Sequence, residues 1–273
     1  MNKGLEFLKL LLVMIGIVLL TAVAGIAATM FGLDPLAQGT TLLLVFITQL
    51  IIALSAYFLV KKEDGKIDGQ FVKNRGFTSD SWKMIVIGLG LAGLGNILIG
   101  AIIQLLPDNS WVNFSLDMVE QAFSTTTTFQ NILMFITACI IAPIAEEYLF
   151  RGYFFEKTHR IYPLAATVVL NGLVFGLYHM NLLQGINTFI MGIILSIVYY
   201  YRQNITDAII IHLVNNVINT LAGYVPQYAN IIGWILIVSI FVGGYFVYKI
   251  IKDGKKIVPV KSDLATDNTK VYE

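Results

Sequence analysis

The chain has 273 residues, of which 57% are hydrophobic and only 13% are charged, whereas ordinary soluble domains carry roughly 25% charged residues. This composition excludes an ordinary soluble fold, because a bilayer about 30 Å thick accepts long uncharged runs as helices, and a single soluble core cannot bury so many of them. The net charge is +1 and the basic residues form no concentrated stripe, so nucleic-acid binding is not expected.

The N-terminal region, residues 1–125, is predicted to contain three membrane-spanning helices. The segments without Asp, Glu, Lys or Arg cover residues 10 to 31, 39 to 60 and 84 to 106. The first follows Lys3 and Lys9 and is longer than the apolar part of a typical secretory signal, so we expect it to be retained as a helix. Beyond the third, the segment 107–130 is expected to contain a short interfacial helix around Phe114–Phe123.

Three glycines in the third segment match a nucleotide-binding pattern. Gly88, Gly90 and Gly93 fit G-x-G-x-x-G, but no predicted strand precedes them and the neighbouring residues are apolar, so phosphate binding is not expected. Small residues at this spacing instead let membrane helices approach closely. We therefore interpret these glycines as a helix-packing surface.

The second half of the chain is predicted to add five helices. One covers residues 131 to 156 and carries charges within it. The stretches 161 to 201 and 208 to 248 contain no Asp, Glu, Lys or Arg and are too long for one helix, so each should fold as a hairpin. The expected breaks are Asn181–Gly185 and Val225–Gln227. The predicted fold class is therefore all-α, a polytopic bundle of about eight membrane spans.

The distribution of Lys and Arg predicts the orientation of this bundle. With the N-terminus inside, the basic residues of every connection fall on the cytoplasmic side, as the positive-inside rule requires. Both termini are therefore expected in the cytoplasm, with 225–251 as the last membrane helix and 252–273 as a disordered polar tail. The run Tyr199–Tyr201 is interpreted as an interfacial aromatic belt.

Ionisable and amide side chains inside the predicted spans indicate a functional site, because such groups are costly in lipid. They are Glu146, Glu147, Arg151, His179, His212, Asn215, Asn216 and Asn219. Glu147 and Arg151 are four residues apart and are predicted to form an ion pair. Glu146 and Glu147 diverge by about 100° around the helix, so we expect them to have different roles. The partners of Glu146 must then come from other helices, and the two histidines are the candidates.

The predicted depth of these residues sets a condition on the site. At about 1.5 Å per residue, Glu146 lies roughly 15 Å from the cytoplasmic end of its helix, His212 roughly 10 Å and His179 roughly 20 to 25 Å. The helix that carries His179 must therefore tilt, begin late or break if the three side chains are to meet. The spacing also places Phe175 on the same face as His179, and Asn216 on the same face as His212.

Three short motifs in this half of the chain resemble those of a known family. The segments EEYLFR, FGLYH and HLVNN are similar to the E-E-x-x-x-R, F-x-x-x-H and H-x-x-x-N motifs of the CPBP family. That family includes type II CAAX prenyl proteases and bacterial bacteriocin-processing, self-immunity and abortive-infection-type proteins. The motifs lie in the right order within residues 130–220, each on a separate predicted helix. The resemblance implies a catalytic core over residues 126–224.

The resemblance also implies a mechanism, that of a glutamate-dependent intramembrane endopeptidase. By this analogy Glu146 and His179 hold and deprotonate a water molecule, while His212 and Asn216 donate hydrogen bonds to the oxyanion. The implied supporting residues are Glu147, Arg151 and Phe175. The expected partners are membrane lipids and a peptide or protein substrate in or at the membrane, which would be a bacterial plasma membrane.

Three alternatives stay open at this point. Glu146, His179 and His212 could bind Zn²⁺ and leave one position open for water. The chain has no H-E-x-x-H segment, and the metal-free version, which needs no cofactor, is favoured. A non-catalytic immunity or sensor-regulating protein of the same fold would fit the same topology. A proton-coupled transporter is less favoured, because no internal repeat is evident.

Overall fold

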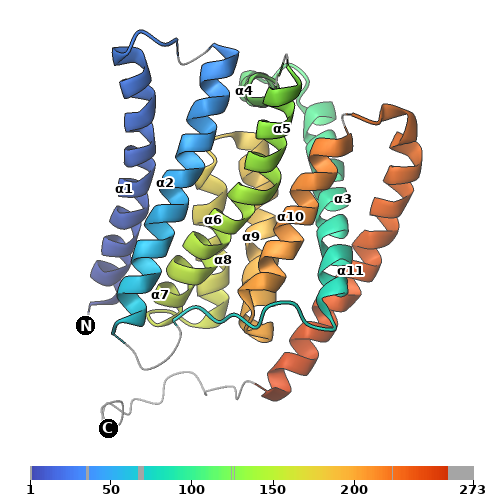
Figure 1. The fold of residues 1–273 in the computed structure, drawn as a ribbon. Helices are drawn as coiled ribbons and strands as arrows, with labels where there is room; N and C mark the ends of the chain where they lie inside the picture. Colours follow the sequence, from blue (N-terminus) through green and yellow to red (C-terminus); the bar gives the residue numbers. More distant parts are fainter. Residues whose placement is uncertain are drawn as a thin grey trace.

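The predicted helical bundle is confirmed by the computed structural model, which describes residues 2–34, 37–66, 71–123, 125, 127–222 and 224–257. Within these residues the chain forms helices and no strand. Seven helices are long and apolar enough to cross a membrane, and α8, with 15 residues, is shorter. Figure 1 shows the long helices side by side in one bundle.

The helices follow the predicted order along the chain. The N-terminal region contains α1 (Lys3–Met30), α2 (Gln38–Asp64), α3 (Ser81–Leu105) and the short helix α4 (Ser110–Phe123). The fourth span consists of α5 (Thr128–Ile136), the π-helical segment η1 (Thr137–Ile141), α6 (Ala142–Glu147), the π-helical segment η2 (Tyr148–Phe155) and α7 (Glu156–His159). The remaining elements are α8 (Leu164–Tyr178), α9 (Leu182–Arg202), α10 (Ile205–Ala222), the 3₁₀ turn η3 (Pro226–Tyr228) and α11 (Ala229–Ile257).

Both long apolar stretches break into hairpins as expected, the first slightly earlier than predicted. Met180 adopts a left-handed conformation with φ of 49°, which ends the helical path after α8. Asn181 then caps α9, because its side chain accepts a hydrogen bond from the backbone N–H of Gln184. The second break falls between Ala222 and Ala229, as the Val-Pro-Gln segment predicted.

The last helix is longer than predicted. We expected a disordered tail from Lys252 onward, but α11 continues to Ile257. Gly254 explains part of this, since it is buried against the ring of Tyr201, and Lys is a good helix former. The rest of the predicted tail, residues 258–273, lies outside the described residues.

The glycines of α3 pack against neighbouring helices, which confirms their interpretation. A methyl group added at Gly90 would lie 2.5 Å from the carbonyl oxygen of Ser239 on α11, and one at Gly88 would lie 2.7 Å from that of Ile211 on α10. Gly93 meets α11 with similar closeness. Only hydrogen at these positions allows such close backbone approach.

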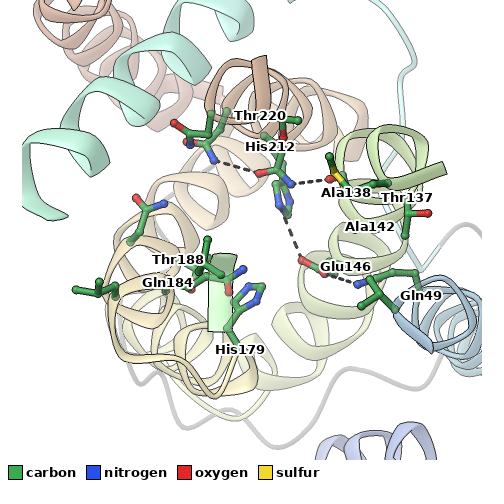
Figure 2. Close-up of a pocket in the computed structure, with 18 of the residues that line it drawn as sticks. Gln49, Thr137, Ala138, Ala142, Glu146, His179, Gln184, Thr188, His212 and Thr220 are labelled. Carbon is green, nitrogen blue, oxygen red and sulfur yellow. Dashed lines mark hydrogen bonds and ion pairs between the residues drawn. The ribbon is translucent and has the colours of Figure 1, made fainter. Parts of the chain in front are cut away.

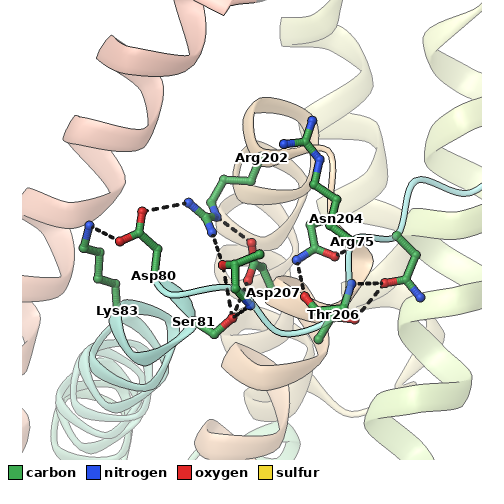
Figure 3. Close-up of polar contacts among 11 residues, drawn as sticks. Arg75, Asp80, Ser81, Lys83, Arg202, Asn204, Thr206 and Asp207 are labelled. Atoms are coloured by element: carbon green, nitrogen blue, oxygen red, sulfur yellow. Dashed lines mark hydrogen bonds and ion pairs between the residues drawn. The ribbon is translucent and has the colours of Figure 1, made fainter.

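The connections predicted to share the cytoplasmic side lie together at one end of the bundle. Arg202, the last residue of α9, pairs with Asp207 and donates to the hydroxyl of Thr78, which precedes α3. The backbone N–H of Arg75 donates to the side chain of Asn204 at 2.8 Å, and Figure 3 shows these contacts. The start of α1 and the end of α11 lie at this same end in Figure 1. Its assignment to the cytoplasm stays a prediction from charge.

The aromatic-belt interpretation is wrong for Tyr199. This side chain is fully buried, its hydroxyl donates to the Glu156 carboxylate at 2.6 Å, and the same hydroxyl accepts from the backbone N–H of Lys73 at 3.2 Å. The sequence analysis missed this role because the acceptor lies on α7, 43 positions away.

The expected short helix before the fourth span is present as α4, and it covers the turn between α8 and α9. The Asn181 side chain donates to the carbonyl oxygen of Ser115 at 2.9 Å, and the Ser115 hydroxyl accepts from the N–H of Leu182 at 3.2 Å. In Figure 1, α4 lies across the end of the bundle opposite the start of α1. The α8–α9 turn is therefore held beneath α4, inside the bundle.

Candidate active site

The fourth span widens where it meets the site, and a proline explains why. In η1 the N–H of Ala142 bonds to the carbonyl of Thr137, five residues back. The same register would pair residue 143 with Ala138, but Pro143 has no N–H. The free Ala138 carbonyl accepts a hydrogen bond from the side chain of Asn216 at 2.9 Å. π-Helical segments are frequent at functional sites, and here one binds an α10 residue of the candidate site.

Glu146 faces a cavity of about 1270 Å³ in the interior of the bundle. Its carboxylate accepts a hydrogen bond from the Gln49 side chain at 3.2 Å, and its other oxygen lies 3.9 Å from Nε2 of His212. Glu146 is only 3% exposed. As predicted, its contacts come from other helices.

Glu147 points away from the cavity lining and has a different environment, also as predicted. It forms the expected ion pair with Arg151, with Nη1 to Oε1 at 2.8 Å and both side chains fully buried. The sequence analysis missed a second contact, because the same Oε1 lies 2.8 Å from Nδ1 of His212. The two glutamates therefore lie at opposite nitrogens of one imidazole.

This arrangement assigns the protons of His212. A carboxylate paired with a guanidinium can only accept, so Nδ1 of His212 carries the hydrogen that Glu147 binds. Nε2 is then directed towards Glu146 and the cavity (Figure 2). The bond from Nδ1 to Glu147 fixes the orientation of the ring, so that Nε2 stays on the cavity side.

Arg151 contacts Glu147, and Phe175 contacts His212. Arg151 donates to the carbonyl oxygen of Gly192 at 3.3 Å and its guanidinium lies 4.5 Å from the centre of the Phe175 ring. That ring also contacts both histidines, with centroid distances of 5.2 Å to His179 and 5.8 Å to His212. Phe175 thus fixes three groups of the site at once.

His179 reaches the site because its helix ends there. It directly follows the last residue of α8, and the chain reverses at Met180. The predicted difference in depth is resolved because α8 is short and α4 covers its end. Nε2 of His179 is buried and has no hydrogen-bond partner in the described part of the chain. Figure 2 shows His179 directed into the cavity that Glu146 and His212 also face.

The asparagines of α10 form a short chain of hydrogen bonds. Asn216, which donates to Ala138, accepts a bond from the Asn215 side chain at 3.1 Å. Both amides line the cavity, and so does Asn219. The predicted residues Glu146, His179, His212 and Asn216 are therefore brought to one cavity by α6, the end of α8 and α10.

Gln49 is the site residue that sequence reasoning missed. It lies on α2, far from the three motifs, and binds Glu146 directly. A signal existed, since an uncharged amide inside a predicted span meets the same criterion that singled out Asn216. It stands alone on its helix, however, and no spacing pattern linked it to the others.

A zinc ion would need three grouped protein ligands and one open position for water. Among the described residues, no three His, Cys, Asp or Glu side chains are grouped so as to hold a metal ion. In this arrangement Nδ1 of His212 is bonded to Glu147, and Nε2 lies 3.9 Å from Glu146. The described polar contacts of His212 are therefore with the two glutamates.

Comparison with known proteins finds a family model that is similar to the part of the chain containing this site. Residues 128–218 match the family model described as type II CAAX prenyl endopeptidase Rce1-like, and no curated protein or solved structure matches the chain. The matched segment runs from α5 into α10 and contains all four candidate catalytic residues, whereas α1 to α4 and α11 lie outside it. Residues 128–218 are therefore similar to the type II CAAX prenyl endopeptidase Rce1-like family, and the apolar helices around them indicate an integral multi-pass membrane protein.

Proposed function

We propose that the chain is an intramembrane endopeptidase that hydrolyses a peptide bond in a membrane-associated substrate. The observation that supports this most directly is the convergence of a carboxylate, two imidazoles and a carboxamide on one cavity within the bundle. Buried polar groups from separate helices are costly in lipid and mark functional sites. The family match over the same residues supports a hydrolase.

Glu146 acts as the general base in this proposal. A water molecule held between Glu146 and the unpartnered Nε2 of His179 gives its proton to the Glu146 carboxylate. The resulting hydroxide attacks the carbonyl carbon of the scissile bond. Gln49 holds one carboxylate oxygen, which leaves the other free to take the proton.

His212 and Asn216 stabilise the tetrahedral oxyanion. Nε2–H of the imidazolium and the second Nδ2 hydrogen of Asn216 are the donors, since the first Asn216 hydrogen is used by Ala138. Donors fixed before the reaction contribute strongly where water is excluded. Protonated Glu146 then gives its proton to the leaving nitrogen and the C–N bond breaks. The acyl product keeps the hydroxide oxygen, and the amine product keeps the proton.

The zinc-dependent version uses Glu146, His179 and His212 as ligands, with Nε2 of His212 facing the metal and Glu147 supporting the ring from Nδ1. We propose the metal-free version because Glu146 has a bonding partner in Gln49 and because, among the described residues, no three His, Cys, Asp or Glu side chains are grouped so as to hold a metal ion. Activity that persists after a chelator treatment supports this version, and loss that is restored by zinc overturns it.

The substrate class is a prenylated protein, a bacteriocin or signalling-peptide precursor, or another membrane protein, and the proposed location is a bacterial plasma membrane. A non-catalytic immunity or sensor-regulating protein is the second candidate, because it needs the same fold without hydrolysis. Glu146→Gln separates the two, since it abolishes catalysis and leaves a scaffold role intact.

The test compares three purified proteins in lipid vesicles loaded with pooled peptides that insert into membranes. Wild type should release fragments with new termini, measured by mass spectrometry, and Glu146→Gln should release none. Glu156→Gln is the matched control, because Glu156 is a partly buried carboxylate of the same span that binds Tyr199 outside the cavity. Equal cleavage by wild type and Glu146→Gln would overturn the proposal.

A further inference from the structure

Two buried carbonyl oxygens at the cavity lack a partner among the described residues. They are Oε1 of Gln49 and Oδ1 of Asn215. Gln49 is 9% exposed and Asn215 is 3% exposed, and both residues line the cavity that contains Glu146. A buried acceptor without a donor is costly, and native structures rarely retain one without a reason such as a ligand.

The direction of the Gln49 amide is fixed by chemistry. An ionised Glu146 carboxylate can only accept a hydrogen bond, so the NH₂ group of Gln49 must face it, as the 3.2 Å contact has it. The carbonyl oxygen then points away from Glu146. Turning the amide over would place two oxygens against each other.

The direction of the Asn215 amide is fixed in the same way, through its neighbour. The backbone carbonyl of Ala138 only accepts, so Asn216 presents its NH₂ group to it and its oxygen to Asn215. Asn215 must therefore donate from its own NH₂ group to Oδ1 of Asn216. Its own Oδ1 then has no partner among the described residues. The orientation of both amides depends on Pro143, because the missing N–H of this proline leaves the Ala138 carbonyl free to accept from Asn216.

The two oxygens approach the cavity from different walls. Gln49 belongs to α2 and lies beside the catalytic base, as Figure 2 shows, while Asn215 belongs to α10 and adjoins the proposed oxyanion donor Asn216. An unwound peptide inside a bilayer needs partners for its main-chain N–H groups, because lipid provides none. Two fixed acceptors at either side of the reacting centre meet that need.

The charge of the lining restricts the peptide further. Within the described part of the chain, the residues around the cavity include no Lys or Arg, and Glu146 is the only acid. A peptide carboxylate bound there would have no Lys or Arg to pair with and would lie near Glu146, which is unfavourable at low dielectric. Amide and hydroxyl side chains supply most of the polar lining, including Thr48, Gln184 and Thr188.

We propose that Gln49 and Asn215 are substrate-binding residues that accept main-chain N–H groups on the two sides of the scissile bond. The site thereby takes an unwound, uncharged stretch of peptide and binds it through its backbone. This inference rests on the proposed protease function, and it adds Gln49, which lies outside the matched segment, and Asn215, which occupies an unspecified position of the H-x-x-x-N motif.

The test removes one substrate N–H at a time. In a peptide that wild type cleaves, each amide near the scissile bond is replaced in turn by an ester, which has no N–H. Two ester positions should lower kcat/KM by about 3- to 10-fold in wild type, the effect of one hydrogen bond. In Gln49→Met, the first ester should leave kcat/KM the same as for the all-amide peptide. In Asn215→Leu, the same should hold for the second ester. Asn219→Leu is the matched control, because Asn219 is an exposed lining amide one turn further along α10, and both ester effects should persist in it.

The outcomes separate this inference from the protease proposal. Cleavage by wild type with ester effects that are absent, or unchanged in both variants, overturns the inference and leaves the protease intact. If wild type cleaves nothing, the inference is tested by peptide binding instead. The measurement is how much of a pool of uncharged peptides with carboxamide ends stays bound to the Glu146→Gln protein. Retention that falls about 3-fold or more on adding Gln49→Met or Asn215→Leu, and that is weaker for carboxylate-ended peptides, supports the inference without hydrolysis. No retention, or retention indifferent to both substitutions, overturns it.

Discussion

Replacement of Arg151 by Met should destabilise the protein strongly, because it leaves a buried carboxylate without its cation. Both Arg151 and Glu147 are fully buried, and the guanidinium makes the 2.8 Å contact with Glu147 and a 3.3 Å bond to Gly192. Breaking a buried pair by removing one partner costs about 3–5 kcal/mol. His212 still binds Glu147 through Nδ1, so we expect the lower end, about 3 kcal/mol, which for a chain of this size is a fall of roughly 6–12 °C in Tm.

The assay is thermal unfolding of the purified protein in one detergent, followed by the fluorescence of its tryptophans. The informative control is the double variant Glu147→Gln, Arg151→Met, in which no buried charge is left unpaired. It should be more stable than Arg151→Met alone, because replacing both members of a buried pair is often nearly neutral. If the double variant is the less stable of the two, the ion-pair reasoning is refuted.

The remaining predictions concern the support of the site and the packing of the bundle. Glu147→Gln should lower kcat about 100-fold with little change in KM, because His212 loses the carboxylate that stabilises its donor form; peptide cleavage kinetics measure this, and an unchanged kcat contradicts it. Phe175→Leu should lower kcat at least tenfold while unfolding free energy falls by only about 1–3 kcal/mol, because both imidazoles lose a packed ring; loss of stability without loss of kcat contradicts this. Gly90→Ala should destabilise by about 1–3 kcal/mol through overlap with α11, whereas Gly100→Ala, which meets nothing within 4 Å, should be neutral or stabilising by up to about 1 kcal/mol. Similar Tm values for the two variants would contradict the packing account.

The helix order and the Glu147–Arg151 pair could be predicted because their causes are local. An uncharged run of sufficient length forms a helix in lipid, and two residues four apart meet on one face. The convergence of Glu146, His179 and His212 on one cavity was expected from the motif resemblance, and the geometry reported above is consistent with it. Their catalytic roles stay a proposal.

Contacts between distant segments could not be predicted from these patterns. Gln49 binds Glu146 across 97 positions, and His212 meets Glu147 across 65. The π-helical register of η1 depends on Pro143, which has no N–H, and on Asn216 of α10, which donates to the free carbonyl of Ala138. Neither segment alone reveals this combination. Tyr199 was misinterpreted for the same reason, because its burial depends on its hydrogen-bond partner on α7.

The central claim is that Glu146 and His212 act as parts of one catalytic unit. The most direct measurement is kcat for Glu146→Gln, His212→Phe and the variant with both substitutions, on one peptide in the same vesicles. Residues that act as a unit are strongly non-additive. The double variant should therefore be no slower than the slower single variant, whereas losses that multiply would show that the two side chains act independently and would contradict the account.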